Sequence, residues 1–485
     1  MLALQPAHAA AACLTLAVAL PLGSQEPITL QQAIALAQER GFQAQAARAA
    51  RDAARYRSDA FTARLLPQLS LSGTVPAYNR LVVPVVLPSG NTAFRPQDQT
   101  NPALTLLLSQ KLPVTGGDFL VTSSLSRLEV LGPQSIVTWF STPISIGLQQ
   151  NILRPNVAGW DRREQNVRTE LAERTYREAL EDIALATTDF FFDMYGARVA
   201  LDNAVANAAV NDTLYSLNNG RFTLGKIGEN DLLQSELALL RARAALERSR
   251  LDDERATAAL RLALHLPPGA PLAIAVSTGV PEFEADTARA VAEALRNRAL
   301  VSDVELREVQ ARRRVTEAKL TNGFGATVQA TYGLNATAPT ADLAYQNLLN
   351  ARQFTVSVQM PLWQWGAHTS DIQAAEADRE GVVSQSRALI ERAVHEAHFA
   401  ALDLALARRN VAVLAKADTV GQKRFEVAYN RYLIGRIAMD NLYIAQTEKD
   451  QALTNFVQGL RSYWQAHYRL RRATLFDFAT GQTIR

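Results

Sequence analysis

The residues of this sequence that come closest to a metal-binding motif are His395 and His398, with Glu396 between them. A zinc helix of the metalloprotease type needs its two histidines four residues apart, so that both reach the metal from one helix face. Here they are three residues apart. We therefore interpret them as two histidines on a helix surface and predict no metal site.

Other motifs for catalysis or cofactor binding are incomplete. Gly323 and Gly325 precede alternating residues rather than a helix, unlike the glycines of a dinucleotide-binding loop. Gly225-Lys226 lacks both the earlier glycine and the following Ser or Thr of a phosphate-binding loop. No Ser/His/Asp set stands out. The sequence therefore predicts neither an enzyme nor a cofactor-binding protein.

The nearly equal numbers of basic and acidic residues do not indicate a strongly charged binding partner. The 485 residues include 50 basic and 47 acidic side chains, for a formal net charge of +3. No Lys/Arg cluster is interleaved with aromatic residues, so binding to nucleic acid is not expected.

Residues 1–24 have the features of a secretory signal peptide. The apolar run from Ala9 to Leu22 has signal-peptide length and is too short to cross a bilayer as a helix. The usual basic start is missing, because no Lys or Arg precedes Arg40. Lipidation of Cys13 is disfavoured, since the apolar stretch follows this cysteine instead of preceding it. After cleavage the chain would be free of cysteine, which suits an oxidising compartment.

The two halves of the sequence resemble each other. Residues 221–227 match 431–437 at an offset of 210, and 144–149 match 354–359 at the same offset. Further upstream, 36–41 match 294–299 at an offset of 258, which places about 48 extra residues in the first half. Each half therefore predicts the order helix, strand, loop, strand, long helix, sharp turn, helix.

Two unusually long helices are predicted. No proline interrupts 158–222 or 367–433, and at 1.5 Å per residue each would be roughly 100 Å long. Helices of this length with repeated apolar residues pack side by side as coiled coils. Gly225 and Gly435 follow these stretches and would allow a tight reversal.

Four segments alternate between apolar and small neutral polar residues, as lipid-facing strands with a wet lumen do. They are 68–75, 144–149, 324–332 and 353–362. A half-buried sheet in a soluble protein would alternate in the same way. We favour membrane strands because the polar positions are almost uncharged and aromatic residues cluster at strand ends, as at membrane interfaces. The aromatic residues are Tyr78, Trp139, Phe140, Trp363 and Trp365.

Four strands cannot close a barrel, and an open edge cannot lie in lipid. Several copies of the chain must then share one barrel. Residues 104–112 and 119–128 also alternate around a Gly116-Gly117 turn. They either add two strands per copy, which we favour, or form an external hairpin.

With these helices, strands and turns in this order, the sequence resembles the TolC family of outer-membrane efflux proteins. The resemblance covers essentially the whole chain after the signal peptide. The segments that carry the resemblance are 28–34, the helix-to-strand junction 66–73, the strand exit 360–363, and the glycine turns at Gly225 and Gly435. Their order and duplication are more specific than any one motif.

The resemblance implies a homotrimer in the outer membrane, with a shared β-barrel in the lipid and a helical barrel extending into the periplasm. It implies passive conduction of substrates delivered by an inner-membrane pump of RND, ABC or MFS type through a periplasmic membrane-fusion adaptor, in an efflux or type I secretion system. The helix tips that would contact the adaptor are Leu224, Gly225, Lys226, Ile227 and Gly228, with Ile434, Gly435, Arg436, Ile437 and Ala438.

Members of the family narrow the periplasmic entrance with acidic residues just after the second turn. The matching positions here are Asp440 and Asn441, with Asp231 in the first half. Ile444 stands where a second aspartate would be expected, so an acidic ring would be incomplete. Alternatively, Asp231 and Asp440 simply stabilise helix N-termini.

The predicted fold is mainly α with membrane β. The expected segments are a signal peptide 1–24; a first repeat 28–266, with helices 28–66 and 158–266 and strands within 68–150; a linker 267–286; a second repeat 287–472, with helices 287–321 and 367–472 and strands 323–334 and 351–362; and a tail 473–485. Two competing hypotheses are a periplasmic coiled-coil tether without a pore and a secreted enzyme with a helical insertion.

Overall fold

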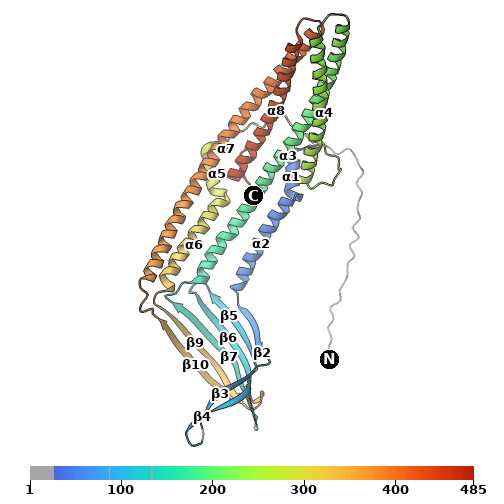
Figure 1. Ribbon diagram of the computed structural model, residues 1–485. Helices are drawn as coiled ribbons and strands as arrows, with labels where there is room; N and C mark the ends of the chain where they lie inside the picture. Colours follow the sequence, from blue (N-terminus) through green and yellow to red (C-terminus); the bar gives the residue numbers. More distant parts are fainter. Residues whose placement is uncertain (1–26, 87, 133–134, 485) are drawn as a thin grey trace. The chain divides into compact units, whose positions relative to one another are not determined.

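The computed structural model describes residues 27–86, 88–132 and 135–484 (Figure 1). These residues form two compact units. The predicted signal peptide 1–24 and Cys13 lie outside the described residues. Unit 1 comprises the described part of Met1–Phe42, with Ala186–Val280 and Leu414–Arg461. Unit 2 comprises Gln43–Leu185, Pro281–Val413 and Ser462–Arg485.

Long helices supply most of unit 1. Helix α3 is Val157–Thr223 and helix α7 is Ala367–Leu433, each of 67 residues, and each contributes its second part to this unit. They differ from the predicted ranges 158–222 and 367–433 by at most one residue at either end. After a short turn each is followed by a second helix, α4 (Glu229–Ala263) and α8 (Met439–Thr474).

The N-terminal segment of the described chain corrects the prediction of one helix over 28–66. Strand β1 (Ile28–Thr29) pairs in parallel with β8 (Ile274–Ala275), which lies in the predicted linker. Helix α1 (Leu30–Arg40) follows, and α2 (Phe42–Arg64) is separate. The break occurs at Gly41, which has extended backbone (φ −60°, ψ 147°) and where a Cβ atom would lie 2.5 Å from the Ala37 carbonyl oxygen.

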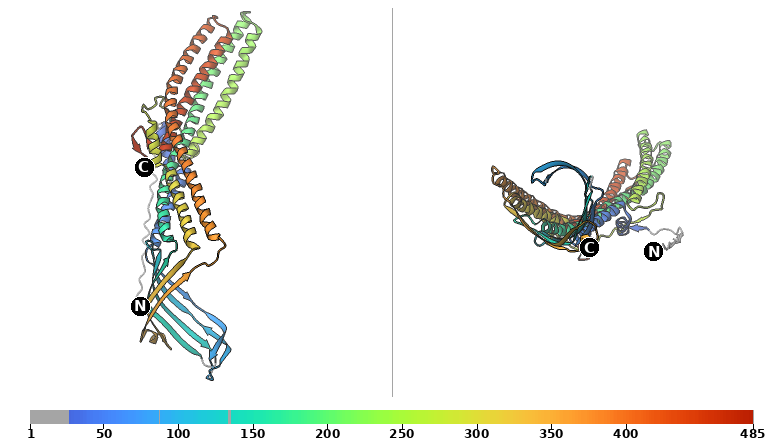
Figure 2. Two further views of the ribbon diagram at one scale, coloured as in Figure 1. Left: turned by 90° about the vertical axis from the view of Figure 1, so that its left-hand side faces the viewer. Right: turned by 90° about the horizontal axis from the view of Figure 1, so that it is seen from below.

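Unit 2 contains one antiparallel sheet that lies at the end of its helices (Figure 2). A continuous path runs in the order β2-β5-β6-β7-β9-β10. The strands of this path are β2 (Gln68–Thr74), β5 (Ala103–Leu112), β6 (Gly117–Leu131), β7 (Ile136–Ile152), β9 (Gly325–Ala338) and β10 (Leu349–Gln359).

A second ribbon branches from this sheet. Strands β3 (Tyr78–Val86) and β4 (Thr92–Thr100) pair with each other along their whole length. Only Asp98–Thr100 of β4 joins the sheet, opposite Glu129–Leu131 of β6. The alternating segments 104–112 and 119–128 thus lie in β5 and β6, within the sheet rather than in the branching ribbon.

The remaining elements of unit 2 are short or broken. The predicted helix 287–321 is divided at Arg298 into α5 (Thr287–Asn297) and α6 (Ala299–Thr321), because Arg298 has extended backbone (φ −66°, ψ 145°). The 3₁₀ turn η1 (Leu343–Tyr345) lies between β9 and β10. The predicted tail forms a small hairpin of β11 (Phe476–Asp477) and β12 (Gln482–Thr483). Among the described residues, no helix is both long enough and apolar enough to cross a membrane.

Candidate functional site

One face of the sheet in unit 2 is apolar and exposed. Residues directly opposite each other on neighbouring strands share a face, and the register links Leu108, Val121, Ile146 and Tyr332 across four strands. At the two edge strands the same face carries Leu71, 69% exposed, and Phe354, 72% exposed. Other exposed apolar residues on it are Leu69, Leu104, Leu106, Ile144, Leu148, Val356 and Val358. An apolar face of this extent needs a partner other than water.

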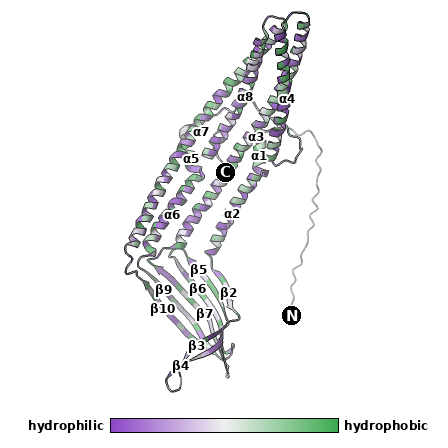
Figure 3. Ribbon diagram, in the orientation of Figure 1, coloured by the Kyte–Doolittle hydropathy of each residue, from purple (hydrophilic) through white to green (hydrophobic). Residues whose placement is uncertain are grey.

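The opposite face carries mainly small neutral polar side chains, so hydrophobic and hydrophilic residues alternate along the strands (Figure 3). Its residues include Gln68, Ser70, Ser72, Thr105, Ser109, Thr122, Ser124, Ser145, Gln149, Thr327, Gln329, Thr331, Gln353, Thr355 and Ser357. The large apolar exceptions on it are Leu107, Leu120, Leu128, Val130, Ile136, Phe140 and Leu349, and the charged exceptions on the apolar face include Arg127, Glu129 and Arg352. Lys111 lies opposite Asp118, where β5 turns into β6.

The sheet ends in two open edges. Within the described chain, β2 pairs only with β5 and β10 pairs only with β9. Each edge strand therefore presents a row of backbone donors and acceptors without a partner strand, which is a template for pairing with another chain.

The two helix reversals of unit 1 have the same backbone geometry. Gly225 and Gly435 have φ of 66° and 72°, the left-handed conformation that favours glycine. The Gly225 amide donates to the Phe222 carbonyl (2.8 Å) and the Lys226 amide to the Arg221 carbonyl (2.9 Å). Gly435 and Arg436 repeat this pair of bonds, at 3.0 and 2.9 Å. Both helices thus end in a Schellman motif.

The predicted tip residues are mostly exposed. Ile227 and Ile437 are half-buried, and the other eight positions of the two tips are exposed. The tips therefore offer to solvent their glycine backbone, the apolar side chains of Leu224 and Ile434 and the cationic side chains of Lys226 and Arg436, whereas one isoleucine of each turn is half-buried.

Contacts join the two hairpins just behind the tips. The Tyr432 hydroxyl donates to Oδ1 of the buried Asn218 (2.7 Å), and Asn218 donates from Nδ2 to the Met439 sulfur (3.5 Å). The Arg221 guanidinium donates to the Leu433 carbonyl (2.9 Å) and lies 5.2 Å from the Tyr432 ring centre. Leu214, Tyr432, Met439 and Leu442 form a buried apolar cluster here.

The predicted entrance residues lie in the first turns of the returning helices. Asp231 and Glu229 are in the first turn of α4, and Asp440 is in that of α8. Asp440 accepts a hydrogen bond from Gln234 Nε2 of α4 (2.7 Å), so its carboxylate joins the two hairpins. Asn441 is exposed. These positions agree with helix N-terminal carboxylates, which the macrodipole stabilises.

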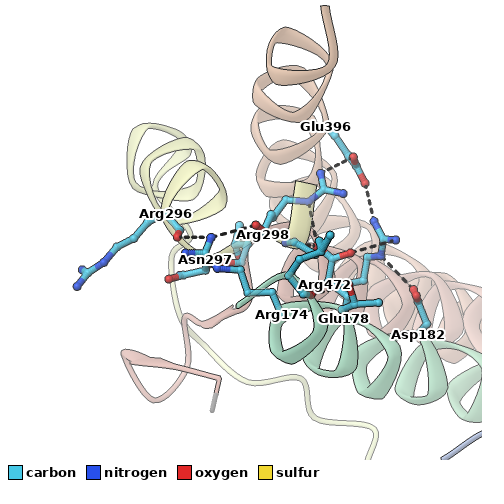
Figure 4. Close-up of polar contacts among 12 residues, drawn as sticks. Arg174, Glu178, Asp182, Arg296, Asn297, Arg298, Glu396 and Arg472 are labelled. Atoms are coloured by element: carbon cyan, nitrogen blue, oxygen red, sulfur yellow. Dashed lines mark hydrogen bonds and ion pairs between the residues drawn. The ribbon is translucent and has the colours of Figure 1, made fainter. Parts of the chain in front are cut away.

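An ionic network in unit 2 explains the break between α5 and α6 (Figure 4). The side chain of Arg298 is only 7% exposed and lies 2.7 Å from Glu396 and 3.6 Å from Glu178. Arg472 approaches the same two carboxylates and pairs with Asp182 at 3.0 Å. Glu396, which lies between the two histidines of the sequence motif, therefore serves as an ion-pair partner.

Comparison with known proteins gives a clear result for the fold. No protein-family model and no curated protein sequence matches the chain. Among solved structures it is similar to the CmeC outer membrane channel of Campylobacter jejuni, with a TM-score of 0.65 at 15% identity over 94% of this chain and 86% of that one. The outer membrane protein VceC of Vibrio cholerae gives 0.63 at 15% identity, over 94% and 97% of the two chains. The MtrE outer membrane channel of Neisseria gonorrhoeae gives 0.62 at 13% identity, over 94% and 89%.

The chain has the outer-membrane channel fold. These neighbours are channels of the TolC family, so the predicted resemblance is confirmed at the level of the fold. They are channel proteins rather than enzymes, in agreement with the prediction from the sequence.

The channel fold includes a groove in unit 1 that the sequence did not reveal. It has a volume of about 840 Å³ and is lined by α3, α4 and α8. Asp450 lies in it, held by the amides of Asn203 and Asn207 at 2.8 Å each, and Lys449 lies 3.2 Å from the Asn207 side-chain oxygen. The hydrogen-bond partners of Asp450 and Lys449 thus lie on α3 of the same unit. These polar side chains therefore stabilise the packing between α3 and α8. Asn203 and Asn207 are four residues apart, about one helical turn, so they lie on the same face of α3. This spacing is the only sign of the groove that the sequence offers.

The two histidines of the candidate metal motif lie on α7 of the channel fold beside Phe399. The His395 ring stacks on Phe399 with centroids 6.3 Å apart, and His398 meets the same ring edge-on at 5.4 Å. Among the residues that the structure describes, no three or more His, Cys, Asp or Glu side chains are grouped so that they could hold a metal ion.

Proposed function

We propose that this chain is one protomer of a homotrimeric outer-membrane channel that passively conducts substrates from the periplasm to the exterior. The observation that carries the proposal is the sheet of unit 2, with an exposed apolar face, a neutral polar face and two unpaired edges. Lipid would cover the first face and water the second, while neighbouring copies would pair with the edges. This would place the sheet in the outer membrane and the helices in the periplasm.

The glycine reversals are the proposed contact with the rest of a transport system. The exposed segments 224–228 and 434–438 would dock on a periplasmic membrane-fusion adaptor, which would link the channel to an inner-membrane pump of RND, ABC or MFS type. The likeness to CmeC, VceC and MtrE supports an outer-membrane channel role. An efflux system and a type I secretion system would use the same arrangement.

Opening of the periplasmic end would occur at the tips. Asp231, Asp440 and Asn441 are proposed to narrow this entrance, since they occupy or adjoin the first turns beyond the reversals. The left-handed glycines Gly225 and Gly435 would act as the hinges. Engineered disulfides that join the tips of neighbouring copies should abolish conductance, and reduction should restore it.

Planar-bilayer recording tests the proposal. Protein extracted from membranes in detergent should give discrete single-channel currents and a mass of three chains. A coiled-coil tether would give neither current nor a heat-modifiable species on a denaturing gel. The matched sample is the same protein boiled before reconstitution, which should give no current.

A further inference from the structure

We propose that β5 and β6 are part of the barrel wall, so that each copy contributes six strands and the channel has a wide, neutral exit. This inference rests on the proposed trimeric channel, in which three copies of the six-stranded path β2-β5-β6-β7-β9-β10 make eighteen strands.

The first support is the position of β5 and β6 within the sheet. Every residue of β2 from Gln68 to Thr74 pairs with β5, and β5 pairs with β6 from Ala103 to Leu112 without a register shift. Strand β6 then pairs with β7 along most of its length. An external hairpin would leave β2 and β7 as neighbours, whereas here the β5–β6 pair separates them.

The second support is that β5 and β6 continue the two faces of the sheet. Leu104 and Leu106 are exposed on the apolar face, opposite Gly73 and Leu71 of β2. Thr105 and Ser124 are paired on the polar face. A hairpin outside the membrane would not need an apolar face that matches the lipid-facing one.

The direction of the two edges is compatible with a wall of six strands per copy. The path contains an even number of antiparallel strands, so β2 and β10 run in opposite directions. Strand β10 of one copy can therefore pair with β2 of the next copy as another antiparallel neighbour. The occupant of these edges is thus a second copy of this chain, and the lumen is incomplete without it.

Strand number sets the width of the exit. Barrel diameter grows roughly linearly with strand number, and barrels of about 16–18 strands leave an aqueous channel. Relative to four strands per copy, six would widen the barrel about 1.5-fold and its cross-section about twofold. Because the lining is mostly uncharged Ser, Thr and Gln, the exit would select bulky solutes by size rather than by the sign of their charge.

Cysteine labelling tests whether β5 and β6 line the barrel. The chain has one natural cysteine, Cys13, within the predicted signal. In proteoliposomes, a water-soluble maleimide should label Thr105→Cys and Ser124→Cys through the lumen. Leu106→Cys and Val121→Cys, on the opposite face, should be protected by lipid. Equal labelling of all four positions would overturn the inference, because both faces of an external hairpin are wet.

Cross-linking tests the seam between copies. Ser70→Cys is combined in turn with Gln353→Cys, Thr355→Cys and Ser357→Cys, all on the polar face, and at least one pair should give covalent trimers on a denaturing gel. Within one copy the two strands are five strand spacings apart, about 24 Å, and a disulfide spans only about 4–7 Å between Cα atoms. Ser70→Cys with Val356→Cys is the control, because these side chains lie on opposite faces. Absence of trimers from all three test pairs would contradict the seam.

Conductance distinguishes this inference from the proposed function. A variant in which a short turn replaces residues 76–135 would keep four strands per copy, and neutral polymers added at the barrel end should enter its lumen only up to a smaller size than in the natural protein. The same polymer size limit for the two proteins would contradict the wider wall. Should that variant fail to assemble, the labelling pattern decides. Loss of all current from the natural protein would instead count against the channel itself.

Discussion

The Tyr432 hydroxyl donates a 2.7 Å hydrogen bond to the side-chain oxygen of Asn218, which is completely buried. This bond joins the last turns of α7 and α3, so the two tip hairpins of one copy are held together by a specific polar contact inside an apolar cluster. Any opening at the tips must either break it or move both hairpins as one body.

Replacing Tyr432 by Phe should destabilise the tips by about 1–3 kcal/mol, because the buried Asn218 oxygen loses its donor. Hydrogen exchange of amides in 214–223 and 432–443 should become correspondingly faster. Tyr443→Phe is the matched control, since the Tyr443 hydroxyl is buried and has no hydrogen-bond partner among the described residues. Its removal should leave exchange unchanged or slower, and equal effects of the two substitutions would contradict the role of the bond.

Replacing Arg471 by Met should cost about 3–5 kcal/mol of folding free energy. The Arg471 guanidinium binds both oxygens of Glu181 at 3.0 Å, and that carboxylate is only 2% exposed. Removing the cation leaves a buried carboxylate with its charge uncompensated. Chemical denaturation in detergent measures the loss.

Arg243→Met is the control for this ion pair. Arg243 and Asp212 form a surface pair with side chains 61% and 62% exposed, and breaking it should change stability by less than about 1 kcal/mol. Similar destabilisation by the two substitutions would show that burial does not set the strength of the Arg471 pair.

His467 should make folding sensitive to acid. Burial among Phe283, Trp464 and Tyr468, with a smaller effect of Arg471, lowers the pKa of His467 to about 4. Above pH 6.5 the imidazole is neutral in both states. As the pH falls from 6.5 towards 4, only the unfolded chain takes up the proton, so stability falls, by about 2 kcal/mol at pH 5. Below pH 4 this loss stops growing.

The comparison of pH 7 with pH 5 checks this dependence. His467→Gln should reduce the difference in unfolding free energy between the two pH values. His395→Gln, at an exposed position on α7, should leave the difference as in the natural protein. An unchanged difference in His467→Gln would show that other groups account for acid sensitivity.

Gly225→Ala should strain the first reversal by about 1 kcal/mol, because its φ of 66° disfavours a side chain. Gly220→Ala is matched to it, since both glycines have open space around a would-be Cβ but Gly220 lies within α3 and has no left-handed φ. Amide exchange near the turn should accelerate in the first variant alone. Equal acceleration would mean that the left-handed backbone is not the reason for glycine.

The sequence predicts the long helices and their reversals well, and the interrupted segments poorly. Absence of proline defines α3 and α7 closely, and Gly225 and Gly435 mark the reversals because both have positive φ there. The strands β3 and β4 were not predicted, since Leu81, Val82 and Val85 place apolar residues on both faces and remove the alternation. The break at Arg298 depends on carboxylates far away in the sequence, which no local pattern contains.

The insertion of β5 and β6 as a pair has a consequence for how such sheets change in evolution. A hairpin adds one strand in each direction, so the strands on either side keep their orientation and still lead back to the same helices. A single added strand would reverse the direction of every strand that follows it. The chain would then leave the sheet at the end opposite to the helices. The circumference of the barrel can therefore change in steps of one hairpin, with no alteration to the helical part of the chain.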